Sequence, residues 1–322
     1  LHMSGEATGI QQAVSVDATQ RVGWIGAGRM GAAMAQRLIA AGGNLAVYNR
    51  TRSKAEPLGA LGATLVDGPR DLGSCDIVFS MLAGPESFLA VMLGENGLLS
   101  GEGPFPRYVV DCSTISAEAS EEVREAGARL GVSLLDAPVS GNAKVVDAGK
   151  LAIVCSGERG AFDAAEPFLK AIGPGVTYAG EGNTARIVKI CHNVHLTVVI
   201  QSLVEILALA EKSGVPRHAL MDFINHSVMG SMFTGYKTPA LVKLDYTPTF
   251  TAPLLRKDMD LGLSAARALD GPMPLAAQTR EILQALIGNG FTECDFAALL
   301  ELQARASNLK LEPEDVEVGT GL

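Results

Sequence analysis

The segment ARIVKICHNV, residues 185–194, is largely apolar, yet it contains Lys189 and, four residues later, Asn193. This spacing puts both side chains on one face of a helix. A partly buried lysine has a lowered pKa and can serve as a general acid or base at a substrate oxygen, with the amide positioning the reactants. The alternative is an ordinary polar stripe, because four more polar residues continue this face: Arg186, Thr197, Gln201 and Glu205.

A glycine loop lies far upstream in the stretch VGWIGAGRMG. Gly26, Gly28 and Gly31 form the pattern G-x-G-x-x-G directly after a predicted strand and at the start of a predicted helix. In this context the first glycine permits a tight turn, the second lets a pyrophosphate approach the backbone, and the third allows helix–strand packing. The loop therefore predicts dinucleotide binding; the alternative is a structural turn.

The end of the next predicted strand indicates which dinucleotide is bound. NAD-binding proteins tend to carry an acid there for the ribose 2′-hydroxyl, whereas this chain has Asn49, Arg50 and Thr51. Asn49 does not repel a 2′-phosphate, Arg50 can bind it through charge-assisted hydrogen bonds, and Thr51 can donate another. We expect NADP(H) to be favoured over NAD(H).

The segment APVSGN offers an anion site after another predicted strand. The small residues Ser140 and Gly141 can expose backbone amides to a carboxylate, although a simple glycine turn has the same composition.

Five motifs in this order resemble one known family. They are the glycine loop, DCSTIS (111–116), DAPVSG (136–141), GNTARIVKICHN (182–193) and RKDMDLGL (256–263). The chain resembles the β-hydroxyacid dehydrogenases, the group of 3-hydroxyisobutyrate dehydrogenase, tartronate semialdehyde reductase and glyoxylate/succinic semialdehyde reductase, over about residues 21–308. The resemblance implies a Rossmann-type domain followed by a helical domain that also makes a homodimer or tetramer contact.

The resemblance also implies roles for individual residues. Lys189 matches the catalytic lysine and Asn193 the positioning amide. The implied substrate-binding residues are Ser113, Ser140, Gly141, Asn142 and Lys257. Asn142 stands where the family usually has a second glycine, which favours a larger or differently substituted substrate. The candidate cofactor-binding residues are Gly26, Ala27, Gly28, Arg29, Met30, Gly31, Asn49, Arg50, Thr51, Met81, Leu82, Thr114 and Lys257.

Other polar residues near these motifs have weaker claims. Asp258 is expected to order its helix rather than take part in chemistry. His192 and His195 lie on other faces of the helix from Asn193, and we interpret both as structural. Lys237 is either a second anion contact or a surface lysine, in a group with Ser231, Phe233 and Tyr236 that could line the far side of a pocket.

Alternating strand and helix patterns over residues 21–181 predict an α/β fold, a Rossmann-type doubly wound parallel sheet. The expected strands are 21–26, 44–49, 76–81, 107–112, 132–137, 151–156 and 175–180. After Gly182 the pattern becomes helical, with one long helix to about Gly214 and shorter ones over 216–226, 253–268, 274–288 and 295–308. We therefore expect a flexible arm (1–20), an NADP-binding domain (21–181), an all-helical substrate and dimerisation domain (182–310) and an acidic tail (311–322).

Composition excludes several other classes of protein. The net charge of −9 provides no nucleic-acid surface. The five cysteines form no C-x-x-C pair, which indicates reduced thiols and no metal site. The apolar segment 194–210 is interrupted by polar residues and predicts a buried helix rather than a membrane span. No basic start precedes an apolar run at the N-terminus, so we expect no secretory signal and a cytoplasmic location.

The sequence thus predicts an NADP-preferring oxidoreductase acting on a small 3-hydroxy acid or semialdehyde, a carboxylate-bearing substrate, with Lys189 as acid and base. Two alternatives stay open: an imine reductase of related architecture, and a dinucleotide-binding sensor without turnover. The exact substrate, the physiological direction and the stereochemistry do not follow from the sequence.

Overall fold

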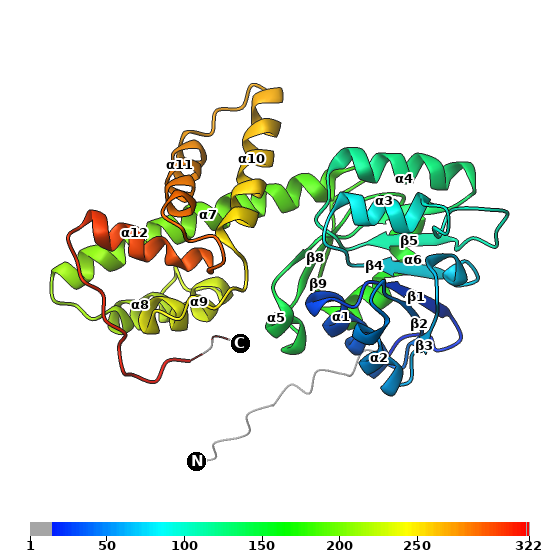
Figure 1. Ribbon diagram of the computed structural model, residues 1–322, viewed down its shortest axis with the longest axis horizontal. Helices are drawn as coiled ribbons and strands as arrows, with labels where there is room; N and C mark the ends of the chain where they lie inside the picture. Colours follow the sequence, from blue (N-terminus) through cyan, green and yellow to red (C-terminus); the bar gives the residue numbers. More distant parts are fainter. Residues whose placement is uncertain (1–14, 320, 322) are drawn as a thin grey trace, which may run out of the picture. The chain divides into compact units, whose positions relative to one another are not determined.

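A computed structural model describes residues 15–319 and residue 321 (Figure 1). The chain divides into two compact units, residues 1–186 and residues 187–322. We call them the sheet unit and the helical unit and describe each by itself.

The sheet unit contains a six-stranded parallel sheet with the strand order β3-β2-β1-β4-β5-β6. Its strands are β1 (Arg21–Ile25), β2 (Asn44–Tyr48), β3 (Thr64–Leu65), β4 (Ile77–Ser80), β5 (Tyr108–Asp111) and β6 (Ser133–Asp136). The chain order reverses beside β1, where β1 pairs with both β2 and β4. In open α/β sheets ligands bind at the carboxyl ends of the strands next to such a switch point. The predicted fold class is confirmed.

Helices cover both faces of this sheet because its strands are apolar on both sides (Figure 1). Ile25 and Val78 belong to a core with Phe88 of α3 (Pro85–Leu93) and Val123 of α4 (Ala117–Arg129). The neighbouring strand residue Phe79 points to the opposite face, where it packs edge-on against Phe168 of α6 (Arg159–Ile172). Helix α1 (Arg29–Ala40) packs against α6, and α2 (Glu56–Ala60) follows β2.

The last strands form a separate sheet, which differs from the single sheet expected. β8 (Ala152–Cys155) and β9 (Gly175–Tyr178) pair in parallel, and β7 (Val139–Ser140) joins β8 antiparallel. Pro138 lies between β6 and β7; because proline has no amide hydrogen, it cannot donate to a sheet ladder. The short helix α5 (Ala143–Asp147) connects β7 to β8.

The expected N-terminal arm, residues 1–20, lies largely outside the described residues. Val16 is described, and it is buried with its amide donating to Ala41 O at 3.1 Å. This part of the segment is therefore held on the sheet unit rather than loose.

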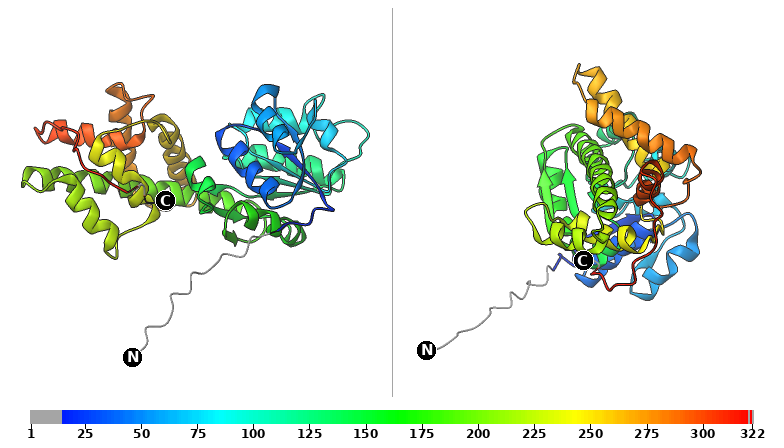
Figure 2. Two further views of the ribbon diagram at one scale, coloured as in Figure 1. Left: turned by 90° about the horizontal axis from the view of Figure 1, so that it is seen from below. Right: turned by 90° about the vertical axis from the view of Figure 1, so that its left-hand side faces the viewer.

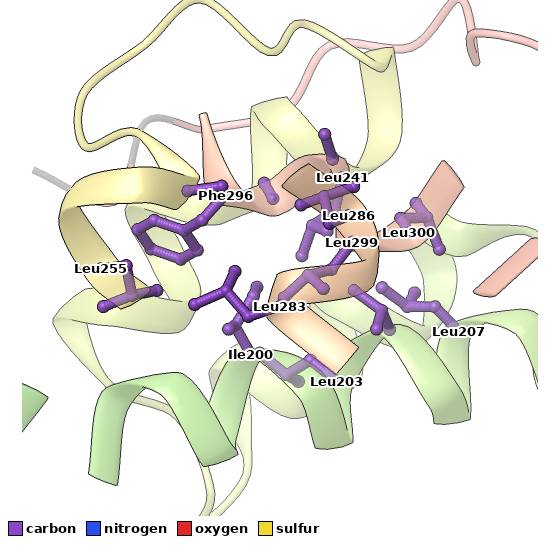
Figure 3. Packing of buried hydrophobic residues seen from close by; sticks show 14 of the residues in the cluster. Ile200, Leu203, Leu207, Leu241, Leu255, Leu283, Leu286, Phe296, Leu299 and Leu300 are labelled. Atoms are coloured by element: carbon purple, nitrogen blue, oxygen red, sulfur yellow. The ribbon is translucent and has the colours of Figure 1, made fainter. Parts of the chain in front are cut away.

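In the helical unit, shorter helices gather around α7 (Thr184–Lys212), which begins at the end of the sheet unit (Figures 1 and 2). They are α8 (Arg217–His226), α9 (Met232–Lys243), α10 (Ala252–Ala268), α11 (Pro274–Gly288) and α12 (Leu299–Ala306). In Figure 3, Ile200, Leu203 and Leu207 of α7 point toward leucines of α11 and α12. By length and composition α7 could cross a membrane, but half of its most apolar window is buried inside the protein.

Helix α9 is not among the predicted helices. It contains Gly235 and Pro239, which both disfavour a helix interior. Ser231 caps its start by accepting from the Thr234 amide at 3.1 Å, and Leu241 and Val242 are buried in the core of the helical unit. Capping and burial therefore override propensity in this segment.

The predicted acidic tail packs on the helical unit over part of its length. Arg217 is fully buried and donates to Glu312 O at 2.6 Å, while the Glu314 carboxylate accepts from the amides of Arg217 and His218.

Candidate functional site

The glycine loop lies at the carboxyl end of β1. A Cβ on Gly26 would lie 2.3 Å from Met81 O, and one on Gly31 would lie 2.1 Å from Gly26 O, so both positions exclude side chains. Gly28 differs, because no other described heavy atom lies within 4 Å of its ideal Cβ. It is the N-cap of α1 and provides no side-chain acceptor for the first helical amides. Among the described residues the loop thus leaves open space beside Gly28 and a helix N-terminus without a side-chain cap, which fits a pyrophosphate.

Asn49 has a different place from the one predicted. Its Oδ1 accepts from the Ala27 amide at 2.8 Å and its Nδ2 donates to Thr51 O at 2.7 Å. The side chain therefore braces the glycine loop against the end of β2. Arg50 and Thr51 are exposed beside it, so the Arg50 guanidinium and the Thr51 hydroxyl are accessible to a ligand.

The carboxyl ends of β4 and β5 are tied together by Ser113. Its Oγ accepts from the Leu82 amide at 2.8 Å, and its own amide donates to Asp111 Oδ1 at 3.2 Å. Ser113 is fully buried, and these hydrogen bonds make it a support for this loop, while its contact with the substrate stays a prediction. Met81, Leu82 and Thr114, which are half-buried, are the more accessible residues at these two strand ends.

A buried charge network, which the sequence does not reveal, lies beside these loops. Arg186 Nη2 lies 3.2 Å from Asp111 Oδ2 and 2.6 Å from Asp136 Oδ1, and Arg124 Nη2 lies 2.8 Å from Asp136 Oδ2. Burial raises the pKa of Asp111, and the Arg186 guanidinium opposes this shift. The network fixes the first turn of α7 to the strand ends. Arg186 is thus a structural residue that pairs with two buried carboxylates, whereas the sequence placed it only in a polar stripe along the helix.

Asn142 is the N-cap of α5, and its Oδ1 accepts from the Val145 amide at 3.2 Å. Helix capping is thus one role of Asn142, and the expectation of a larger or differently substituted substrate stays a prediction. The preceding Gly141 has a φ of +140° and its Cβ would lie 2.8 Å from Val145 Cγ1, so only glycine fits. Ser140, the other residue of the predicted anion site, is half-buried at the end of β7.

In the helical unit, α7 and α10 bring Lys189, Asn193 and Asp258 together. Asn193 Nδ2 donates to Asp258 Oδ2 at 2.6 Å. The close approach depends on Gly262, one turn after Asp258, because a Cβ there would lie 2.5 Å from Val194 Cγ2. Asp258 is only 3 % exposed, and its Oδ1 accepts no hydrogen bond from any described residue. Asp258 thus joins α10 to α7 through Asn193, a contact that the sequence did not indicate, and its expected role in ordering the helix stays a prediction.

The electrostatics of this cluster suit proton transfer. Burial of the ammonium lowers the pKa of Lys189 to about 8, and the Asp258 carboxylate acts in the opposite direction. Lys189 as a residue is half-buried. A group with a pKa near neutrality can both donate and accept a proton at working pH. Lys257 adds a second ammonium, 49 % exposed, with Nζ 3.6 Å from Asp258 Oδ1.

Two further expectations are corrected. His192 Nδ1 lies 2.9 Å from Asn193 Oδ1, so His192 belongs to the cluster from which the sequence excluded it. Lys237 is neither an anion contact nor a surface lysine. It is 2 % exposed, pairs with Asp295 at 2.6 Å and lies over the Phe296 ring. Among residues 15–319 and 321, no three His, Cys, Asp or Glu side chains are grouped as metal ligands.

Comparison with known proteins gives matches along most of the chain. Residues 21–180 match the family described as the NAD binding domain of 6-phosphogluconate dehydrogenase. Residues 180–303 match the family described as NAD-binding of NADP-dependent 3-hydroxyisobutyrate dehydrogenase.

Two curated relatives and one solved structure illustrate the similarity. The chloroplastic glyoxylate/succinic semialdehyde reductase 2 of Arabidopsis thaliana is 32 % identical over 88 % of this chain and 79 % of its own length. The NAD-dependent L-serine dehydrogenase of Pseudomonas aeruginosa is 30 % identical over 88 % of this chain and 97 % of its own length. The structure of Mycobacterium tuberculosis 3-hydroxyisobutyrate dehydrogenase with L-serine matches with a TM-score of 0.75 and 26 % sequence identity. The match covers 88 % of this chain and 98 % of that chain.

Proposed function

Because the chain belongs to the 3-hydroxyisobutyrate dehydrogenase and glyoxylate reductase family of NAD(P)-dependent oxidoreductases, we propose that it interconverts a small 3-hydroxy acid and its semialdehyde with NADP(H), using Lys189 as acid and base. The observation that carries this proposal is the Asn193–Asp258 hydrogen bond beside Lys189. A structural polar stripe does not need a buried carboxylate on the neighbouring helix, and Asp258 is only 3 % exposed.

Proton movement is the task of Lys189 in this mechanism. The bound dinucleotide supplies or accepts the hydride at the carbinol carbon. In reduction, the Lys189 ammonium donates a proton to the carbonyl oxygen and becomes a neutral amine. In oxidation, the neutral amine of Lys189 takes the proton of the substrate hydroxyl and becomes the ammonium again.

The surroundings of Lys189 set its pKa in a range that suits proton transfer. The Asp258 carboxylate keeps the pKa of Lys189 from falling further, while burial keeps it near neutrality. Asn193 is fixed by Asp258 and supplies an amide next to the reacting oxygen. Two ammoniums and one carboxylate leave the cluster cationic, which favours a carboxylate-bearing substrate. Glyoxylate, succinic semialdehyde, L-serine and 3-hydroxyisobutyrate, all taken from the relatives, are the first compounds to test.

The preference for NADP(H) rests on the end of β2. Asn49 is an amide whose two polar atoms are both engaged by the backbone, so no carboxylate opposes a 2′-phosphate there. Arg50 and Thr51 are exposed at the same place. Replacing Arg50 with Ala should weaken NADPH binding by about tenfold or more and NADH binding little, since a charge-assisted bond to phosphate is lost. Arg52→Ala, which breaks an exposed pair with Asp67, is the matched control.

The direct test replaces Lys189 with Ala and follows NADPH absorbance with the four compounds. Turnover should fall by about 10²–10⁴-fold, while NADPH binding measured by fluorescence stays unchanged. Lys212→Ala, on the last turn of the same helix, is the control and should keep wild-type turnover. A Lys189→Ala variant with wild-type turnover would refute the role of Lys189 as acid and base. If the wild-type protein reduces only cyclic imines, it is an imine reductase instead. If it binds NADPH without turning over any compound, it is a dinucleotide-binding sensor instead.

A further inference from the structure

His192 takes part in a short chain of hydrogen bonds with Asn193 and Asp258. Its Nδ1 lies 2.9 Å from Asn193 Oδ1, and Asn193 Nδ2 lies 2.6 Å from Asp258 Oδ2. The chain thus runs from an imidazole on α7, through the amide, to a buried carboxylate on α10.

The chemistry of these groups fixes the direction of each hydrogen bond. An ionised carboxylate only accepts hydrogen bonds, so the amide nitrogen of Asn193 must face Asp258. The amide oxygen then faces His192, and because that oxygen only accepts, the imidazole must present an Nδ1–H. If His192 carried no proton on Nδ1, two lone pairs would face each other across this contact.

We infer that His192 is a positioning residue for the reaction: its Nδ1–H donates to Asn193 Oδ1 and thereby holds the Asn193 amide on Asp258. This inference rests on the proposed function, in which Asn193 and Asp258 support Lys189. It goes beyond that function in assigning a positioning role to the His192 side chain, which contacts the Asn193 amide.

The surroundings of His192 keep it neutral rather than cationic. Although His192 is an exposed residue, partial burial of the imidazole and the charges of Lys189 and His195 lower the pKa of His192, against the effect of its bond to Asn193. Lys189 and His195 come from α7, and Asp258 with Lys257 come from α10. A neutral ring has one N–H, and the contact with Asn193 requires it on Nδ1.

The first experiment observes the tautomer and does not depend on turnover. The full chain is labelled with ¹⁵N-histidine, and long-range ¹H–¹⁵N spectra are recorded at pH 8 without substrate. His192 is assigned among the five histidines by its loss in His192→Phe. We expect its Nδ1 to be protonated and its Nε2 to be unprotonated. A neutral ring protonated at Nε2 would overturn the inference, even if the enzyme is fully active.

The second experiment separates positioning from folding. His192→Phe removes the donor and should lower kcat/KM for the substrate by about 3–10-fold, the loss of one neutral hydrogen bond, with NADPH binding unchanged. His192→Asn restores an N–H donor at a similar place and should recover most of this loss. His195→Phe, three residues further along α7, is the control for removing an imidazole. Wild-type kcat/KM in His192→Phe, or an equal loss in His195→Phe, would refute the role of His192.

These outcomes are distinct from failure of the proposed function. If Lys189→Ala keeps full turnover, the acid–base mechanism fails while the tautomer measurement still decides the hydrogen-bond chain. If Lys189→Ala is inactive but His192→Phe is not impaired, only the inference about His192 fails.

Discussion

The lowered pKa of Lys189 predicts opposite pH dependences for the two reaction directions. With a pKa of about 8, about 10 % of the lysine is neutral at pH 7, whereas an ordinary lysine with a pKa of 10.5 would be only about 0.03 % neutral. Initial rates of hydroxy acid oxidation, which need the amine, should rise about tenfold per unit of pH and level off above about 8. Initial rates of reduction, which need the ammonium, should be constant at low pH and fall above about 8.

Asp258→Asn provides the perturbation that tests this assignment. The amide keeps an oxygen for Asn193 Nδ2 but removes the charge that raises the pKa of Lys189. A nearby opposite charge is worth about 1 unit or more, which would bring the pKa of Lys189 to about 7. The initial rate of oxidation at pH 7 should then rise by up to about fivefold, and the initial rate of reduction at pH 8 should fall by about fivefold.

The assay is the initial rate of NADPH formation or loss, measured between pH 5.5 and 10 with saturating substrates. Structural damage lowers both directions together, so only a change in the pKa of Lys189 gives opposite signs. A break point that stays near pH 8 in Asp258→Asn, or that moves upward, would refute the coupling of Asp258 to Lys189.

Two further predictions concern the scaffold. Gly31→Ala should prevent stable folding, because its Cβ would lie 2.1 Å from a backbone oxygen, whereas Gly28→Ala should fold normally and lose NADPH affinity; circular dichroism and NADPH titration separate the two. Asp295→Ala should lower the free energy of unfolding by about 3–5 kcal/mol, because Lys237 is left buried and unpaired. Urea denaturation measures this loss, and Lys310→Ala, in an exposed pair, should show no measurable change.

Much of the fold follows from the sequence because its signals are local. All seven predicted strands are present, since short apolar runs between turns mark strands, although β9 is only half-buried or exposed along its length. The long helix α7 also follows from its continuous apolar pattern. The short strands β3 and β7 and the helix α9 do not, because pairing partners or burial stabilise them against weak local preferences.

The candidate site was predictable only where one element carries the whole pattern. Lys189 and Asn193 share one helix, so their spacing reveals them. Asp258 is 65 residues away from Asn193, and no spacing rule links the two. Asn142 shows the opposite problem: a helix-capping asparagine and a ligand-binding asparagine look alike in a sequence, and the bond to the Val145 amide is seen only in the structure.

The continuity of α7 has a consequence for building hybrid enzymes from this family. Arg186 is locked into the charge network of the sheet unit, and Lys189 follows it by three residues on the same helix. Each residue of an α-helix turns the chain by about 100° and advances it by about 1.5 Å. A junction that adds or removes one residue between these two positions would swing the lysine about a quarter-turn around the helix axis. Hybrids should therefore be joined upstream of Arg186 or downstream of Asn193, with the helical phase of the intervening segment left intact.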